Sequence, residues 1–367
     1  MNIKALLTIS TLGLIVYFSG VGCARLSRAS QQQQQFSASG QSEKLKSVRP
    51  ARLDGQFSVY VTEARNRFYR EQFLWLEEEA SRLRASKDRF PGGYWKLNAL
   101  YTALGNPEGE ESASEEDWEK HLAILRNWVK QQPRSLTAIV GLGDALINYG
   151  WKARGTGRAA GVGDAEWRLY NSRMAEAEQV LNDARWLSQQ CPHWYVAMLR
   201  LGQSTGWDAR RFNKLFAEAV KLEPTYYYYY RIKATYLMPR WYGEPGDWEK
   251  FATESARQVG GDEGDIIFFL IYTHMLGMHD ITFMSNPRRA AWPQILAGFR
   301  ALEKHYGVSP QHLNEACFLA FLSMDRQVAA ELFERIGEQY DASVWRSRSR
   351  FELFRTGALR DAAQKKD

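Results

Sequence analysis

The chain has 367 residues, 45% of them hydrophobic and 25% charged, which is the composition of a folded globular protein and not of a disordered or fibrous one. Its formal net charge is +6, and basic residues alternate with acidic ones along most of the sequence, whereas a nucleic-acid-binding protein would concentrate them in one patch. We therefore expect no nucleic acid among its partners. Aromatic residues make up 13% of the chain, enough to fill the layers between helices and to line a groove.

Residues 1–23 predict an export signal. Lys4 precedes an apolar run from residue 5 to residue 18, and small residues then end in Gly22-Cys23-Ala24. This ending resembles a bacterial lipobox, which implies acylation of Cys23. Cleavage after Ala24 and retention of the apolar run as a membrane anchor are the alternatives. All three predict an exported protein, either a periplasmic or outer-membrane-associated lipoprotein or one held by a single N-terminal anchor.

Residues 24–55 predict a flexible tether, because the Gln31 to Gln35 run lies in a polar, Ser-containing stretch that cannot bury a core. We expect helical repeats over residues 56–260, further helical hairpins continuous with them over residues 261–357, and a disordered tail over residues 358–367. No segment shows the two-residue alternation of a strand, so the prediction is an all-α chain with about fourteen helices.

The stretch from Cys191 to Gly260 shows the repeating unit most clearly. It contains four helix-length segments, each closed by Gly or Pro. In the second segment, apolar residues recur at helical spacing after Asp208, which stands where an N-cap would, and Pro224 closes the run. The fourth segment repeats this design with Asp247 as the cap. The stretch therefore predicts two consecutive helical hairpins.

Within this stretch, three residues have the spacing of the second half of a tetratricopeptide (TPR) repeat: Phe216, Ala219 and Pro224. Leu201-Gly202 resembles the first half, and Trp207 and Trp241 lie one repeat length of 34 residues apart. With its WKARGTG segment and its export signal, the chain also resembles a family of bacterial envelope proteins labelled only as a domain of unknown function. The resemblance covers roughly residues 57–260. It implies a TPR-like α-solenoid of stacked helical hairpins, but it does not imply an activity.

Two loops carry the candidate binding residues. The glycine-rich segment from Gly150 to Trp167 contains Arg154 and Arg158, which together with glycine amides can hold a phosphate or carboxylate. The other interpretation is an irregular connection fixed by its arginines. The second loop, PRWYGEPGD, lies one repeat after Trp207, and either forms a ligand groove or plugs the end of a hairpin. Its candidate residues are Arg240, Trp241, Tyr242 and Asp247, and Trp207 is a further candidate for the same groove.

The chain lacks the common motifs of catalysis, metal binding and cofactor binding. Its six His are not at metal-ligand spacing, and neither a nucleophile elbow nor a phosphate-binding loop occurs. We expect no catalytic residue, no metal and no cofactor. Cys191 and Cys317 either form a disulfide or remain buried thiols. The one enzymatic pattern is a pair of carboxylates of the kind glycosidases use, drawn from two groups: Asp262, Glu263 and Asp265, or Glu244 and Asp247.

Five consecutive tyrosines, Tyr226 to Tyr230, lie inside the first helix of a predicted hairpin, and we expect their rings in the core and their hydroxyls in water. Taken together, the sequence predicts a non-enzymatic scaffold of the cell envelope that binds a peptide or protein partner on the concave face of a solenoid. The alternative is a carbohydrate-active hydrolase with an (α/α)-barrel-like fold. The two differ in topology, because a solenoid keeps its contacts between successive repeats whereas a barrel brings its first and last helices together.

Overall fold

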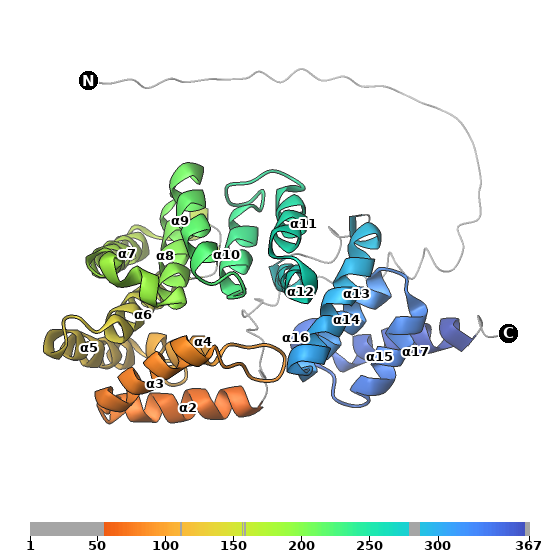
Figure 1. Ribbon diagram of the computed structural model, residues 1–367, viewed down its shortest axis with the longest axis horizontal. Helices are drawn as coiled ribbons and strands as arrows, with labels where there is room; N and C mark the ends of the chain where they lie inside the picture. Colours follow the sequence, from red (N-terminus) through yellow and green to blue (C-terminus); the bar gives the residue numbers. More distant parts are fainter. Residues whose placement is uncertain (1–54, 111, 156, 158, 279–286, 364–367) are drawn as a thin grey trace, which may run out of the picture. The chain divides into compact units, whose positions relative to one another are not determined.

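The computed structural model describes residues 55–363 apart from residues 111, 156, 158 and 279–286. Over these residues the chain forms sixteen α-helices, two short 3-10 helices and no strand, which confirms the predicted all-α class (Figure 1). None of the described helices combines the length and the apolarity that a membrane span requires. The predicted export signal with Cys23, nearly all of the tether, and Arg158 lie outside the described residues.

The helices follow the chain in pairs, with these bounds: α2 Gly55–Tyr69, α3 Phe73–Ser86, α4 Lys96–Gly105, α5 Glu115–Gln131, α6 Leu136–Arg154, α7 Asp164–Asp183, α8 Pro192–Thr205, α9 Ala209–Leu222, α10 Tyr228–Tyr236, α11 Asp247–Val259, α12 Gly261–Met278, α13 Pro287–Tyr306, α14 Pro310–Leu322, α15 Arg326–Ile336, α16 Ala342–Trp345 and α17 Arg348–Ala363. The 3-10 helices are η1 Ala159–Gly161 and η2 Arg185–Gln190.

The even-numbered helices from α2 to α14 contact one another in chain order, and we call this series the helix row. Helices α7, α9, α11, α13 and α15 each pack against the row helix that precedes them. Figure 1 shows α8, α9, α10 and α11 following one another in this way. Each hairpin therefore buries its apolar faces against the next hairpin as well as within itself.

The stretch from Cys191 to Gly260 forms the four expected helices, α8 to α11. Asp208 caps α9 by accepting a hydrogen bond from the backbone N–H of Arg211 at 2.9 Å. The expected cap of α11 is corrected by one residue. Gly246 is the N-cap, and the carboxylate of Asp247 instead accepts from the backbone N–H of Glu244 at 2.9 Å, which fixes the preceding loop.

Two boundaries differ from the sequence prediction. Helix α6 continues through Gly150 to Arg154, so the irregular glycine-rich segment begins only at Gly155. Within the helix, position 150 is next to α7, and the absence of a side chain leaves room for Met174. A Cβ at this position would lie 2.6 Å from Met174 Cε. Helix α17 runs to Ala363, past the predicted start of the tail at residue 358. Ala358 is fully buried, and Asp361 pairs with Arg326 at 3.3 Å.

Residues 87–95, between α3 and α4, form a bridging loop that reaches helices far along the chain. The backbone N–H of Gly92 donates to the carbonyl of Tyr306 at 3.1 Å. The ring of Tyr94 stacks on His312 of α14 with centroids 4.9 Å apart, and Trp95 meets Tyr226 edge-on at 4.8 Å. Contacts are thus not limited to successive hairpins, so the expectation of a simple open solenoid needs this correction.

Two glycines allow the bridging loop to pack so closely. Gly92 and Gly93 both have positive φ, at 80° and 75°, where other residues are strained. A Cβ at Gly92 would also lie 2.9 Å from Ser309 Cβ, and one at Gly93 would lie 2.9 Å from Leu302 Cδ1. The FPGG sequence therefore does more than end α3, because it permits a backbone contact with the α13–α14 region.

The tyrosine run lies in the core, but its hydroxyls are not in water as expected. Four of the five rings are at most 1% exposed. The hydroxyl of Tyr226 bonds to His193 Nδ1, that of Tyr227 donates to Tyr228, and that of Tyr230 donates to the carbonyl of Pro224. Four of the hydroxyls instead take part in internal hydrogen bonds, and that of Tyr229 is buried without a hydrogen-bond partner among the described residues. Cys191 and Cys317 are buried free thiols and do not form the alternative disulfide.

Candidate ligand cavity

A cavity of about 510 Å³ lies along the helix row, and we call it the row cavity. Its walls come from α4, α6, α8, α10 and α12, together with the loop between α10 and α11. Aromatic rings line part of it: Tyr101, Trp151, Tyr228 and Trp241. Side-chain amides line another part: Asn98, Asn106, Asn148 and Gln203. The charged residues in its wall are Asp144, Arg200, Arg231 and Arg240.

Asp144 and His193 form a buried pair at the base of this wall. His193 Nε2 lies 2.7 Å from Asp144 Oδ2, and both side chains are about 5% exposed. The other ring nitrogen, Nδ1, lies 2.8 Å from the hydroxyl of Tyr226. With Asp144 ionised, Nε2 carries the proton and donates to it, while Nδ1 accepts from Tyr226. Three helical segments, α6, α8 and the start of α10, are joined by this chain of bonds.

The same carboxylate orients an arginine that faces the row cavity. Arg200 Nη1 donates to Asp144 Oδ1 at 3.1 Å, and its Nη2 donates to Asn148 Oδ1 at 2.5 Å. Asn148 in turn donates to Asn106 Oδ1 and to the carbonyl of Gly105, both at 2.9 Å. The guanidinium is therefore fixed on two sides, while about a third of the Arg200 side chain remains exposed.

Aromatic packing holds the imidazole of His193 in place. The ring of Tyr101 stacks on it with centroids 4.4 Å apart and nearly parallel planes. The Tyr101 hydroxyl lies 3.4 Å from the thiol of Cys191, and burial raises its pKa well above the ordinary value. Tyr101 is therefore a neutral phenol, and it lines the row cavity beside His193.

Arg231 and Arg240 lack an ion-pair partner among the described residues. Arg231 Nε donates to the carbonyl of Leu270 at 3.3 Å, and its guanidinium lies 4.7 Å from the centre of the Tyr227 ring. Burial, together with the positive charge of Arg231, lowers the pKa of His274 to about 3. His274 is thus neutral and contributes no charge to the row cavity. Among the described residues, Arg240 makes one side-chain hydrogen bond, to the sulfur of Met278 at 3.5 Å.

Among the sequence candidates, Arg240 and Trp241 line the row cavity. Tyr242 lies beside it and donates to the carbonyl of Gln203 at 3.0 Å. Trp241 meets Trp151 edge-on at 6.2 Å, so the loop after α10 approaches the C-terminal end of α6 at this point.

The other described candidates lie outside the wall. Trp207 is buried beneath Arg211, whose guanidinium lies 3.3 Å from the ring centre. Arg154 packs over Trp151 and donates to the carbonyl oxygens of Gly155 and Gly157, and Asp247 fixes its own loop. The arginine of the glycine-rich segment therefore stabilises an irregular connection, which was the alternative interpretation of that segment.

Sequence analysis missed the polar residues that build the wall. Asp144 stands in the apolar run LTAIVGLGDALINYG, and His193 opens α8 in the sequence PHWYVAML. A charged or polar residue inside an otherwise apolar helix is a detectable signal, because its burial requires partners. The sequence does not show which helices supply those partners, since Asp144 and His193 are 49 positions apart.

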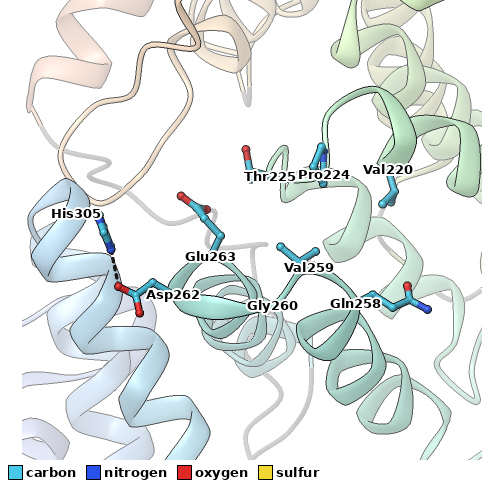
Figure 2. Close-up of a pocket in the computed structure, with 9 residues that line it drawn as sticks. All are labelled: Val220, Pro224, Thr225, Gln258, Val259, Gly260, Asp262, Glu263 and His305. Carbon is cyan, nitrogen blue, oxygen red and sulfur yellow. Dashed lines mark hydrogen bonds and ion pairs between the residues drawn. The ribbon is translucent and has the colours of Figure 1, made fainter.

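A second hollow, the acidic pocket, lies between the end of α9, the end of α11, the start of α12 and the end of α13, and has a volume of about 560 Å³. Figure 2 shows Asp262 bonded to His305, at 2.6 Å, with Glu263 nearby. Hydrogen bonds from His305 and Lys304 lower the pKa of Asp262. Glu263 accepts from the Tyr306 hydroxyl and lies 3.6 Å from Arg89.

The carboxylates of α12 considered for hydrolysis are thus already engaged in the fold. Asp265 accepts a hydrogen bond from Gln294 at 3.1 Å, and Asp262 interacts with both Lys304 and His305. A glycosidase needs one carboxyl with a raised pKa to serve as the acid, and the lowered pKa of Asp262 is opposite to that requirement. The described residues contain no cluster of three or more His, Cys, Asp or Glu arranged to hold a metal ion.

The comparisons with other proteins give no family. No family model, no curated protein and no solved structure matches the chain. The case for function therefore depends on the chemistry of the row cavity.

Proposed function

We propose that this protein is a non-enzymatic binding or scaffold protein that takes a peptide segment of a partner in the row cavity. The observation that carries the proposal is the wall itself, where five consecutive row helices direct aromatic, amide and guanidinium groups into one cavity. Amide side chains donate and accept, so they match the N–H and C=O groups of an extended peptide. Tyr and Trp rings add contact area at low entropic cost, as they do in protein interfaces.

The buried bonds around His193 favour binding over catalysis. Both of its ring nitrogens are occupied, one by Asp144 and one by Tyr226. A general base needs a free nitrogen within hydrogen-bond reach of its substrate. In this geometry the imidazole instead fixes Asp144, and Asp144 fixes Arg200.

The predicted N-terminal segment gives the proposal a location. An exported chain with a lipid on Cys23, or with a retained apolar anchor, would hold the folded part near a membrane through the tether of residues 24–55. We propose that the partner is a protein or peptide of the bacterial cell envelope. A TPR-like solenoid modified by the bridging loop is the fold we propose for this role.

Site-specific photocrosslinking in cells tests the proposal. A photoreactive residue replaces Gln203, which lines the row cavity, and in a matched control replaces Gln258, which lines the acidic pocket. We expect a discrete adduct from position 203 that disappears in the double variant Arg240→Glu, Trp241→Ala, and none from position 258. A folded, expressed protein that gives no adduct at position 203 would contradict binding in the row cavity.

The hydrolase alternative has its own assay. Asp262→Asn combined with Glu263→Gln removes both carboxylates of the acidic pocket. If wild-type protein released soluble sugars from purified envelope polysaccharide and this double variant did not, the enzymatic alternative would replace our proposal. We expect no release by either protein.

A further inference from the structure

The charges in the row cavity do not balance. Three arginines line it, and among the described residues the only carboxylate in the same wall is Asp144, which already interacts with both Arg200 and His193. Arg231 and Arg240 therefore face the cavity without an ion-pair partner among the described residues. Glu315, which lies outside the wall, interacts with Arg231 at longer range.

Glu315 does not supply the missing counter-charge in full. It is buried on α14, where burial raises its pKa to about 7, so only part of the population is ionised near neutral pH. The only hydrogen bond to its carboxyl comes from Gln311, and its other oxygen has no hydrogen-bond partner within the described part of the chain. Arg231 is only partly exposed, so an uncompensated charge there is costly unless a ligand supplies negative charge, whereas Arg240 is exposed to solvent and free to bind an anion.

From this geometry we infer that the occupant of the row cavity carries a carboxylate, held between the guanidinium groups of Arg231 and Arg240 and oriented by Arg200. The inference rests on the proposed function and narrows it from any peptide to an acidic one. The three guanidiniums come from separate elements, α8, α10 and the loop after α10, so they can approach an anion from different sides. Guanidinium forms bidentate, charge-assisted hydrogen bonds with carboxylate.

The rest of the wall favours a peptide over a bare anion. Val196, Ile232 and Tyr228 give the cavity apolar surface beside the charges. Asn98 and Gln203 can pair with backbone amides next to the acidic group. A side-chain carboxylate and a free chain terminus offer the same chemistry, and the experiment below separates the two sources.

The test uses four soluble octapeptide pools and the immobilised full chain. Every pool is randomised over uncharged residues, and the two central positions are fixed as Glu in one pair of pools and as Gln in the other. Each pair is made once with an amidated and once with a free C-terminus. Mass spectrometry measures which peptides the protein retains. Enrichment of the Glu pools by about tenfold over the Gln pools is expected, as is a decline in binding as salt is added.

Three variants assign the effect to the cavity. We expect Arg231→Gln and Arg240→Gln each to lower the enrichment about tenfold, because each removes one charged hydrogen-bonding partner. Arg257→Gln is the matched control, since Arg257 is exposed on α11 and pairs with Glu254 on its own helix. Arg240 is exposed and its one hydrogen bond among the described residues is to Met278, so its variant keeps the test valid even if Arg231→Gln fails to fold.

The outcomes separate this inference from the proposed function. Equal retention of all four pools, whatever the central residues and the C-terminus, overturns the acidic ligand while peptide binding stands. Enrichment that survives in both Arg231→Gln and Arg240→Gln does the same. Enrichment of only the pools with a free C-terminus, regardless of the central residues, supports the carboxylate and assigns it to the chain end. Retention of no pool contradicts both the inference and the peptide-binding proposal.

Discussion

The row cavity and the acidic pocket are similar in volume but differ in how their charges are compensated. In the acidic pocket, Asp262 bonds to His305 and Lys304, and Glu263 lies beside Arg89. In the row cavity, one buried carboxylate serves two partners and two arginines have no ion pair among the described residues. The acidic pocket therefore satisfies its own charges, whereas the unpaired arginines of the row cavity are what the proposed acidic ligand would neutralise.

The largest difference is expected between two aspartates. Asp144→Ala should lower the free energy of unfolding by about 3–5 kcal/mol, because it leaves His193 and Arg200 without their buried partner. Asp262→Ala removes an exposed carboxylate that interacts with Lys304 and His305, and it should change the free energy of unfolding little. Urea denaturation followed by circular dichroism measures both. Similar losses in the two variants would show that the wall of the row cavity is no more tightly coupled than the acidic pocket.

A third carboxyl, Glu315, lies in neither hollow and should respond to pH in the opposite direction to Asp262. Burial raises its pKa to about 7 in the folded chain, above the ordinary 4.5 of the unfolded chain. Its contribution to stability is therefore complete below pH 4.5 and is lost as the pH rises through 7. Glu315→Gln should become more stable than wild type, by up to about 3 kcal/mol, between pH 5 and pH 8. A stability difference that stays constant over this range would contradict the raised pKa.

The bridging loop contacts two residues that line the acidic pocket, because Arg89 donates to Thr225 and pairs with Glu263. Gly92→Ala tests how tightly this loop packs, with Gly155→Ala as the control. Both glycines have positive φ, but a Cβ at Gly155 meets nothing within 4 Å, whereas one at Gly92 meets Ser309. Gly92→Ala should therefore cost about 1–3 kcal/mol more than Gly155→Ala in thermal unfolding. If both substitutions lowered the stability equally, the bridging loop would be able to shift and accommodate the added Cβ.

The smallest effect on stability is expected for Lys233, which lines neither the row cavity nor the acidic pocket. Its amine lies 4.1 Å from the centre of the Phe216 ring, and burial lowers its pKa to about 8. Because the folded pKa is below the unfolded 10.5, stability should rise as the pH increases from 8 to 10.5. Lys233→Met should stabilise the protein by about 1 kcal/mol at pH 7 and lose this advantage at high pH. If Lys233→Met were less stable than wild type at pH 7, the cation–π contact with Phe216 would stabilise the fold by more than the burial of the charged amine destabilises it.

Local patterns predicted much of the fold. The apolar spacing after Asp208 and the closing Pro224 predicted α9, where Asp208 caps the helix. Helical spacing and capping residues involve positions close together in the sequence, so they can be recognised from the sequence alone. The bridging loop could not be predicted, because Gly92 meets Tyr306 through a contact between segments more than two hundred residues apart.

The candidate site was predicted only in part, for the same reason. Arg240 and Trp241 stood out because a loop concentrates unusual residues, and both line the row cavity. Asp144 and Arg200 looked like ordinary helix positions, since their role depends on the faces that α6 and α8 turn toward each other. Whether these residues bind the proposed ligand remains a prediction.

The most direct test of the account locates a bound peptide. An acidic octapeptide enriched from the pools, carrying one photoreactive residue beside its Glu pair, is irradiated with the full chain, and the attached protein residues are mapped by mass spectrometry. We predict attachment to the wall of the row cavity, at Trp241, Met278 or Tyr228, with attachment lost in Arg240→Gln. Attachment mainly to Val259 and Gln258 of the acidic pocket, or evenly over the surface, would contradict the central claim that the row cavity is the binding site.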